Sequence, residues 1–491
     1  GAIIEYTFVD INLNDVETVE VIRGAAASAI YGSRGGNGVI AINTRRGNRL
    51  QEGKTEILLR NEYGINRLTR KYDLATHHAY KLADDHSQHN FTKYDSVIYP
   101  ENYAGTMPGF SGSMVTEDDQ YMDNPYAALF DHEGLIFPGN DFITNYISAG
   151  SNLGKFNYMA SFENHVQAGL IAEIKGYRRN SFRVNFDYSI IPDLTVSASN
   201  LYVRSRTASP GGGSKTSEEI FPDALISSPD ADSTLSNPDG QPYIFTPDAW
   251  NPAIENPFYN LWKIENETDR SSFAGIYGAK LTLLDFLNLE ARYSFHYSTA
   301  ESFIYSPYDT YILTGANPVY SGGSLSLVNS SLSSGNAMAS AGFAKKFGDL
   351  NTGAKLSYLF EKTSFNRESQ YGEDFSHAGI RSFNGITGSK SASSYNERII
   401  SKYITGIFYA WYQEKFLLES VICHNGTSLA GSDVHWNPYV RLSAAYRLAE
   451  DFQIPGVSEL KLRMAFGTAG YRPGFQDQFG VLKSDSKRFV S

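Results

Sequence analysis

The feature that most constrains the fold of this chain is a strict alternation of apolar and polar residues over long stretches. Within residues 182–188, two Phe, one Val and one Tyr share one face, whereas Arg183, Asn185 and Asp187 share the other. Residues 287–298 and 460–466 follow the same scheme. Successive side chains of a strand point to opposite sides of the sheet. Each stretch therefore predicts a β-strand with one apolar and one polar face.

The predicted strands are longer than those of an average globular sheet, which run about 5–6 residues, and suit membrane-spanning strands of about 9–11 residues. We expect about thirteen such strands, each long enough to be a strand of a membrane barrel. They lie at 54–66, 142–152, 156–168, 178–190, 194–207, 271–284, 286–300, 332–346, 351–364, 396–412, 415–428, 437–449 and 458–470.

The predicted connections alternate between short turns and long polar loops. The long loops are 67–141, 208–270, 301–331 and 365–395, whereas links such as 153–155 and 191–193 are tight. This asymmetry is typical of outer-membrane barrels, which have short periplasmic turns and long extracellular loops. A soluble sandwich more often has loops of similar length at both ends.

Composition agrees with a barrel and excludes other classes. Aromatic residues make up 14% of the chain and charged residues 19%, and the mean hydropathy is -0.33. No apolar run approaches the roughly 18 residues of a membrane helix. The net charge of -11 argues against nucleic acid as a partner. Cys423, alone of its type, excludes an intramolecular disulfide and a cysteine zinc site, and we expect it to be a small buried or lipid-facing residue.

The first fifty residues differ from the rest. Residues 19–22 and 39–44 predict two strands, and the Ala-rich stretch 25–31 predicts one or two helical turns. Four glycines between 32 and 38 predict a tight loop. Together they predict a small α/β unit that precedes the long strands.

Residues 14–40, which read NDVETVEVIRGAAASAIYGSRGGNGVI, resemble the end of the plug domain of TonB-dependent outer-membrane transporters. More narrowly, they resemble the SusC/RagA-like branch found in Bacteroidetes, and residues 408–480 carry a weaker likeness to its later barrel strands. The resemblance implies an all-β fold, a large antiparallel transmembrane β-barrel of about 22 strands. Residues 1–50 would be the C-terminal part of the plug domain, and residues 51–491 the N-terminal and middle part of the barrel.

Members of this family are longer than this chain. An odd number of strands does not close a bacterial barrel of the usual kind, and open sheet edges are excluded from lipid. We therefore expect the chain to be an internal portion of a longer protein.

The plug motif carries the residues that the resemblance marks for function. Arg23 and Arg34 are expected to pair with inward-facing barrel carboxylates such as Glu56, Glu62 or Glu290. Such pairs could be a latch that is pulled open or static, solvated ion pairs, and both interpretations remain open. The full set of motif and latch residues is Glu20, Arg23, Gly24, Tyr31, Gly32, Arg34, Gly35, Asn37 and Gly38.

Aromatic residues in the long loops are candidates for contact with a ligand or a partner protein, because rings stack on sugars and grip peptides. The alternative is packing within the loops. These residues are Tyr99, Tyr103, Tyr121, Tyr126, Tyr243 and Trp250.

We predict no metal site and no cofactor. The loop histidines, His77, His78, His86 and His89, match no known ligand spacing, and Asp230, Asp232 and Asp239 lack the glycine and glutamate of a calcium loop. The chain has no nucleophile elbow and no HExxH motif, so we predict that it is not an enzyme.

The function implied by the resemblance is TonB-dependent active import of a nutrient, an oligosaccharide or a peptide, across the outer membrane of a Gram-negative bacterium of the Bacteroidetes. Its partners would be the TonB complex, a SusD-like surface lipoprotein that caps the barrel, membrane lipid, and a second copy in a homodimer. The alternative is a barrel subunit of a structural or secretion-associated assembly that moves no nutrient. A passive porin fits less well, because a porin lumen stays open.

Overall fold

The computed structural model describes residues 11–23, 25–78, 80–82, 115–118, 124–125, 129–210, 217–229, 231–236, 242–246, 255–314, 317–429, 436–452 and 455–478. Within these ranges, no helix is both long and apolar enough to cross a membrane.

The strands are β1 (Val16–Ile22), β2 (Val39–Thr44), β3 (Thr55–Asn66), β4 (His77–His78), β5 (Tyr80–Leu82), β6 (Val115–Asp118), β7 (Asn124–Pro125), β8 (Asn140–Asn152), β9 (Phe156–Gln167), β10 (Tyr177–Ile191), β11 (Leu194–Ala208), β12 (Glu265–Leu284), β13 (Leu287–Ser306), β14 (Tyr311–Thr314), β15 (Asn317–Tyr320), β16 (Ser324–Phe347), β17 (Leu350–Glu373), β18 (Lys390–Tyr412), β19 (Phe416–Thr427), β20 (Trp436–Arg447) and β21 (Lys461–Gly467). The helices are α1 (Ala25–Tyr31), α2 (His132–Ile136), α3 (Ser217–Ile226) and α4 (Pro257–Lys263), with 3-10 turns η2 (Leu13–Asp15), η3 (Gly32–Asn37), η4 (Gly47–Arg49), η6 (Phe383–Gly385), η7 (Leu448–Glu450) and η8 (Phe475–Gln478).

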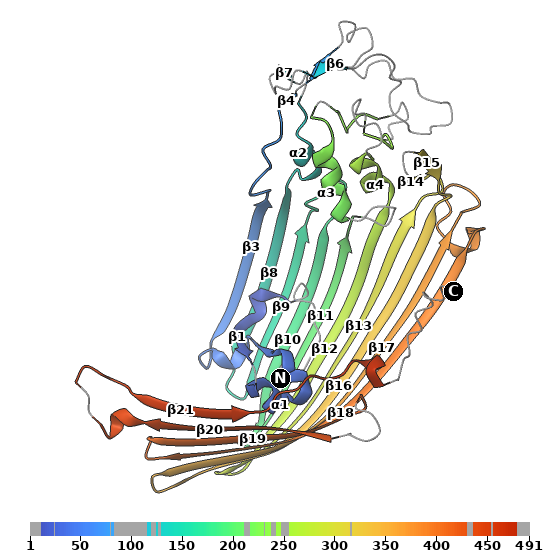
Figure 1. Ribbon diagram of the computed structural model, residues 1–491. Helices are drawn as coiled ribbons and strands as arrows, with labels where there is room; N and C mark the ends of the chain where they lie inside the picture. The colour runs from blue at the N-terminus through green and yellow to red at the C-terminus, as the bar shows by residue number, and fades with distance from the viewer. Residues whose placement is uncertain are drawn as a thin grey trace, which may run out of the picture.

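Thirteen long strands form one antiparallel sheet, which confirms the predicted fold class. Their order is β21-β20-β19-β18-β17-β16-β13-β12-β11-β10-β9-β8-β3, so that every strand pairs with its sequence neighbour among the long strands. The sheet curves strongly, with the short turns at one end and the long loops at the other (Figure 1). Among the described residues, β3 and β21 form its two edges.

The two faces of the sheet have opposite character. Ile147, Phe162, Phe182 and Tyr202 lie opposite one another in register across β8 to β11, and each is exposed on the outer face. The neighbouring inward positions are polar and buried, as at Ser148, Ser161 and Ser181. An apolar exterior with a polar interior is the pattern of a membrane barrel and the reverse of a soluble sheet.

Several strands are longer than predicted, and the loops are correspondingly shorter. β16, β17 and β18 begin or end at Ser324, Glu373 and Lys390, inside the loops predicted at 301–331 and 365–395, and β12 begins inside the loop predicted at 208–270. In these extensions, such as residues 366–370, both faces carry polar side chains. Where both faces of a strand meet water, apolar and polar residues no longer alternate. The predicted strands were therefore shorter than the observed ones.

At the loop end, short helices pack over the strands. Ile136 of α2, Ala224 of α3 and Leu261 of α4 form one buried apolar cluster. Asp131 caps α2 by accepting a hydrogen bond from the Gly134 amide at 2.9 Å. These helices fix part of the long loops against the sheet (Figure 1).

Candidate functional site

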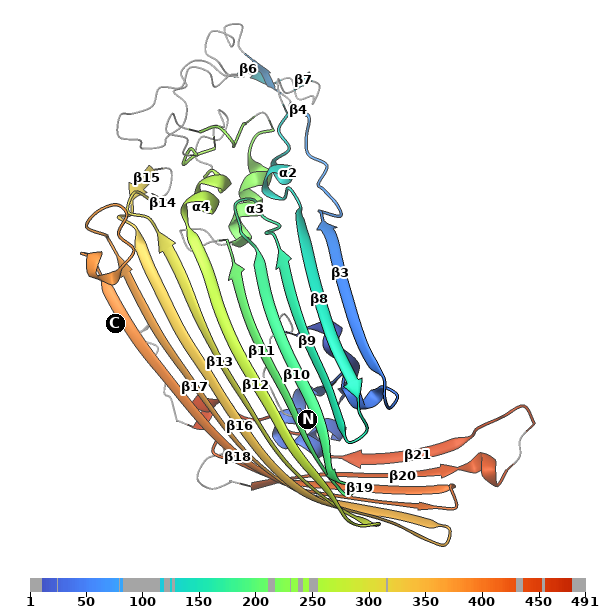
Figure 2. The same ribbon diagram turned by 180° about the vertical axis from the view of Figure 1, so that it is seen from behind.

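Residues 11–50, here called the N-terminal segment, lie on the concave face of the sheet near the end with the short turns (Figures 1 and 2). β1 and β2 pair only with each other, in a separate two-stranded sheet. Strand β3 then joins the large sheet at Thr55. The predicted short helix and flanking strands are present as α1, β1 and β2.

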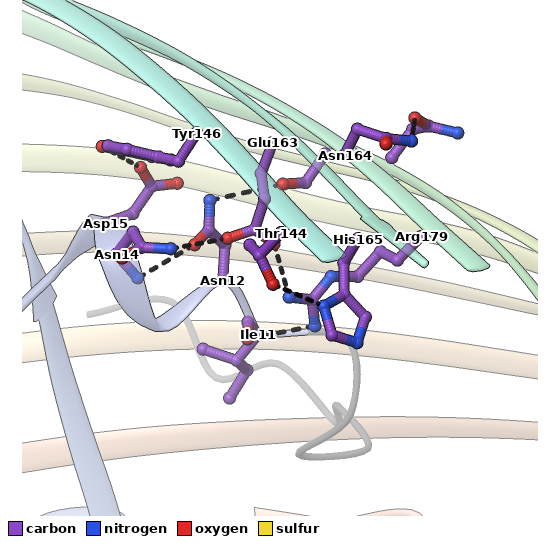
Figure 3. Close-up of polar contacts among 12 residues, drawn as sticks. Ile11, Asn12, Asn14, Asp15, Thr144, Tyr146, Glu163, Asn164, His165 and Arg179 are labelled. Carbon is purple, nitrogen blue, oxygen red and sulfur yellow. Dashed lines mark hydrogen bonds and ion pairs between the residues drawn. The ribbon is translucent and has the colours of Figure 1, made fainter. Parts of the chain in front are cut away.

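Asp15 is the most densely bonded residue where the segment meets the β8–β10 wall. Its side chain is buried and pairs with Arg183, whose Nε donates to Oδ2 at 2.9 Å. Oδ1 accepts hydrogen bonds from the Tyr146 hydroxyl at 3.1 Å and the Ser161 hydroxyl at 2.6 Å. Three adjacent strands thus hold one carboxylate of the segment. Figure 3 shows its bond to Tyr146.

Next to Asp15, the ion pair between Arg179 and Glu163 of the wall also binds the segment. Arg179 donates to Glu163 Oε1 at 2.5 Å, and both side chains are almost fully buried. The second oxygen of Glu163 accepts from Asn14 Nδ2 at 2.8 Å, and Arg179 also donates to the Ile11 carbonyl at 3.3 Å. The pair therefore binds both a side chain and the backbone of the segment (Figure 3).

The end of the segment is held on the same wall. Arg46 pairs with Asp187 at 2.7 Å, and Asn185 Nδ2 donates to the Arg45 carbonyl at 2.8 Å. Gly47 makes the closest backbone approach: a Cβ there would lie 2.4 Å from the Tyr158 carbonyl oxygen. Only a glycine permits this packing.

Between these two regions of the chain, at residues 32–34, the segment contacts the opposite wall, formed by β17 to β20. Arg34 forms an ion pair with Glu361, and both side chains are largely buried. Ser33 donates to Asn425 Oδ1 at 2.9 Å, and Tyr403 donates to the second oxygen of Glu361 at 3.5 Å. Helix α1 packs against β19 and β20 beside these bonds.

Gly32 brings the segment into close contact with this wall. Its φ of +62° suits glycine, and an added Cβ would lie 2.9 Å from the Tyr403 ring and 3.1 Å from Asn425 Cβ. Beneath it lies Cys423, which is 0% exposed and is contacted by the Gly32 amide. The sulfur is thus covered by the segment, as predicted for a small buried residue.

The segment therefore spans the concave face and is bonded to both walls. The β8–β10 wall supplies both carboxylates and arginines, whereas the β17–β20 wall supplies the carboxylate of Glu361 and the amide of Asn425. The segment is anchored at Asp15 on the first wall, at Arg34 on the opposite wall, and at Arg46 on the first wall again. Small residues let its backbone approach the walls.

Arg34 pairs with an inward-facing carboxylate of the large sheet, as expected, but this carboxylate is none of the three given as examples. Arg34 pairs with Glu361, whereas Glu62 pairs with Arg60, and Glu290 with Arg292 and Lys355. Glu56 is exposed near the start of β3. The reason is distance along the sheet, because the segment crosses from β8–β10 to β17–β20 and so reaches a carboxylate eight strands away from β3 in the sheet order.

The other motif residues occupy varied positions. Glu20, Arg23 and Asn37 are exposed, Tyr31 is half-buried, and Gly24 lies outside the described residues. Gly35 is buried, and a Cβ there would lie 2.4 Å from the Ala27 backbone; Gly38 has a φ of +91°. The structure brings Gly32 and Arg34 together at the wall, but not Glu20 or Arg23.

The loop aromatics are mostly beyond what the structure describes. Tyr99, Tyr103, Tyr121, Tyr126 and Trp250 lie outside the described residues. Tyr243 is 0% exposed, so it packs within the loops and offers no surface to a ligand.

The possible metal loops are described only in part. His77 and Asp232 are described, whereas the side chain of His78 and all of His86, His89, Asp84, Asp85, Asp230 and Asp239 are not. Asp232 Oδ1 accepts from the Thr234 amide at 2.9 Å, an ordinary local turn. Among the described residues, no group of three or more His, Cys, Asp or Glu side chains could hold a metal ion.

The residues that hold the segment were visible in the sequence only as polar positions of alternating strands. Arg183, Asn185 and Asp187 form the polar face of β10. Nothing local distinguishes them from charges that face water, and the sheet register is needed to bring Arg183 opposite Ser161 and next to Asp15. Asp15 itself lies in the family-like motif but was not singled out.

Comparisons with known proteins agree with this architecture. No family model matches the sequence. The chain is 22% identical over 476 residues to TonB-dependent receptor P26 of Formosa agariphila, covering 94% of this chain and 44% of that protein. TonB-dependent receptor P3 of the same organism is 20% identical over 309 residues, covering 62% of this chain and 26% of that protein.

The fold is also that of a solved transporter. The RagAB peptide importer in its open-open state superposes with a TM-score of 0.73 at 16% identity, covering 96% of this chain and 52% of that one. The chain thus spans about half the length of P26 and of the matched RagAB chain. These matches confirm the resemblance to TonB-dependent receptors that residues 14–40 indicate.

Proposed function

We propose that this chain is part of a TonB-dependent transporter that imports a nutrient, an oligosaccharide or a peptide, across the outer membrane of a Gram-negative bacterium of the Bacteroidetes. In this proposal residues 1–50 are the last part of the plug and residues 51–491 are barrel. The TonB complex supplies the energy, a SusD-like lipoprotein covers the loop end, and two such complexes associate as a dimer. The similarity to a peptide importer supports it.

The observation that carries the proposal is the bonding of the N-terminal segment to both walls of the concave face. Two ion pairs, Asp15 with Arg183 on one wall and Arg34 with Glu361 on the other, hold the N-terminal segment as a strap across the interior. A barrel of this size has a lumen too wide for its own side chains to fill. A strap bonded across it obstructs passage until it shifts.

The polar character of the contacts suits a part that moves. When buried ion pairs separate, both partners regain hydration, which offsets much of the lost attraction. An apolar interface of the same area would instead expose apolar surface on opening, at about 25 cal/mol per Å². Mechanical work delivered by TonB would then release the strap, with no chemical step in this chain.

A reversible lock of the strap tests the proposal. In the full-length protein with Cys423→Ser, the pair Ser33→Cys and Asn425→Cys places two thiols where a 2.9 Å hydrogen bond now joins the side chains. The native host, a deletion strain and the lock strain are grown on a panel of peptides and polysaccharides as sole nutrients. The two single-cysteine strains serve as controls.

We expect at least one nutrient that supports the wild type and the single-cysteine strains but not the deletion strain. The lock strain should fail on that nutrient and recover with a membrane-permeant reductant. Equal growth of the deletion strain and the wild type on every nutrient would refute import. Full growth of a lock strain whose disulfide is verified by mass spectrometry would refute movement of this strap.

A further inference from the structure

Three rings form a continuous surface on the inner face of the sheet, beside the N-terminal segment on the side of the long loops. Phe142 of β8 lies 6.1 Å from the His165 ring of β9, which lies 5.9 Å from the Tyr177 ring of β10. Each is half-buried or partly exposed. They share a face with Tyr146 and Glu163, because strand positions two apart point the same way.

A guanidinium group lies directly next to this aromatic surface. Arg179 is the register partner of His165, whose Nδ1 lies 2.8 Å from the Thr144 hydroxyl (Figure 3). The same inward row continues through Ser205 to Arg270 of β12. The same row begins at Glu62 of β3, the register partner of Thr144, so it carries two arginines and one carboxylate beside its aromatic and hydroxyl-bearing residues.

This combination defines the chemistry of what it can bind. Aromatic faces bind sugar rings and apolar side chains, and guanidinium groups bind carboxylate or sulfate through paired hydrogen bonds. The chain as a whole carries a net charge of -11, which repels anions. Locally placed arginines are what an anionic ligand would need on this wall.

Arg179 also connects this surface to the segment. Its bond to Glu163 is short, at 2.5 Å, whereas its bond to the Ile11 carbonyl is long, at 3.3 Å. An oxyanion that engages the guanidinium competes first with the weaker acceptor, the neutral carbonyl. Occupancy of the surface would thus loosen the backbone at the start of the segment.

We propose that Phe142, His165, Tyr177 and Arg179 form a contact site for cargo that carries an oxyanion, and that Arg179 transmits its occupancy to the N-terminal segment. The site rests on the proposed function only in that the bound molecule is the imported cargo. Arg179 has two roles in this scheme, because its guanidinium contacts the oxyanion and also donates to the Ile11 carbonyl.

Binding to the purified full-length protein in detergent tests the site. The probes are two matched pairs: oligogalacturonate against its methyl ester, and a short peptide with a free C-terminal carboxylate against its amide. The pairs distinguish a saccharide source of the oxyanion from a peptide source. We expect the anionic member of at least one pair to bind about ten-fold more tightly in calorimetry, the effect of one charge-assisted contact.

Variants then locate the binding. His165→Ala and Tyr177→Ala should each weaken the anionic probe about ten-fold. Phe182→Ala removes an aromatic ring from the outer face of the same strand, β10, and should leave affinity unchanged. Equal affinity within both pairs, no binding of either pair, or unchanged affinity in the two inner variants would overturn the site.

The transmission step has its own readout. In a Cys423→Ser background, Asn12→Cys places a thiol at a position that is 2% exposed and next to Ile11. The anionic probe should speed its reaction with maleimide, and the neutral member of the pair should not. An unchanged rate with saturating anionic probe would overturn transmission. Neither assay involves TonB or growth, so their failure is separate from failure of the import test.

Discussion

Loss of the charge on Glu361 should uncover Cys423. Arg34 and Glu361 hold the part of the N-terminal segment that covers this cysteine, and the Gly32 amide lies against its sulfur. The substitution Glu361→Gln keeps the shape of the side chain and its capacity to accept a hydrogen bond from Tyr403. It leaves the Arg34 guanidinium largely buried without its anion.

The magnitude follows from the burial of the pair. Removing one partner of a buried ion pair costs about 3–5 kcal/mol. The Arg34 side chain is 12% exposed, so some hydration remains and the lower end, about 3 kcal/mol, applies. If maleimide reaches Cys423 only after the segment lifts, each 1.4 kcal/mol raises the labelling rate about ten-fold, so the variant should react about 100-fold faster.

The assay is maleimide labelling followed by intact-mass spectrometry, on the full-length protein with any cysteine other than Cys423 replaced. Glu290→Gln is the matched control, because that carboxylate also faces inward and pairs with Arg292 and Lys355, and it forms no ion pair with the described residues of the segment. Replacing both partners, Arg34→Met with Glu361→Leu, should return the rate most of the way to the wild type. A rate in Glu361→Gln equal to that in Glu290→Gln would refute the reasoning.

Three further predictions test other parts of the structure. Gly47→Ala should destabilise the full-length protein by about 1–3 kcal/mol in denaturant unfolding, because its Cβ would meet backbone oxygens at 2.4 and 2.5 Å, whereas Gly406→Ala, with open space around it, should not. Phe182→Lys should impair insertion into lipid vesicles by up to about 2–4 kcal/mol, since this side chain is 49% exposed on the outer face; wild-type insertion would contradict a lipid-facing position. The hydrogen bond from Lys71, together with the Gly134 amide, holds the pKa of Asp131 below its ordinary value. A carboxyl whose pKa is lowered in the folded state stabilises the fold above its ordinary pKa, and this stabilisation is lost as the pH falls through the folded-state pKa. Proteolysis near α2 should therefore rise below about pH 4 in the wild type. In Asp131→Asn it should be independent of pH.

The strands could be predicted because their signal is local. Alternation of apolar and polar residues needs no knowledge of the neighbouring strand, and it located all thirteen strands of the large sheet. The prediction ended early wherever a strand continued with polar residues on both faces, as in residues 366–370 of β17. Water on both sides removes the asymmetry on which the pattern depends.

The site could not be predicted in the same way, because its contacts join positions far apart in sequence. Arg34 and Glu361 are 327 residues apart, and Asp15 and Arg183 are 168 apart. Glu62 and Glu290 also lie at polar, inward positions of long strands, as Glu361 does, but they pair with residues of the sheet itself. Only the path of the segment across the concave face distinguishes them, and no periodicity encodes that path.

The composition of the contact surface also bears on the choice between a transporter and a purely structural barrel. A permanent plug gains stability most directly by burying large apolar side chains, at about 1.5–3 kcal/mol for each. Here the buried contacts of the segment are instead made by Asn12, Asp15, Ser33 and the small residues Ala27 and Ala29. The walls contribute serine, asparagine, paired charges and two tyrosines, Tyr146 and Tyr403, whose hydroxyls bond to carboxylates. Water can solvate these polar groups when the segment lifts. Such a surface gives up stability in the docked state and lowers the cost of separation, which benefits a part that moves repeatedly and serves no purpose in one that never does.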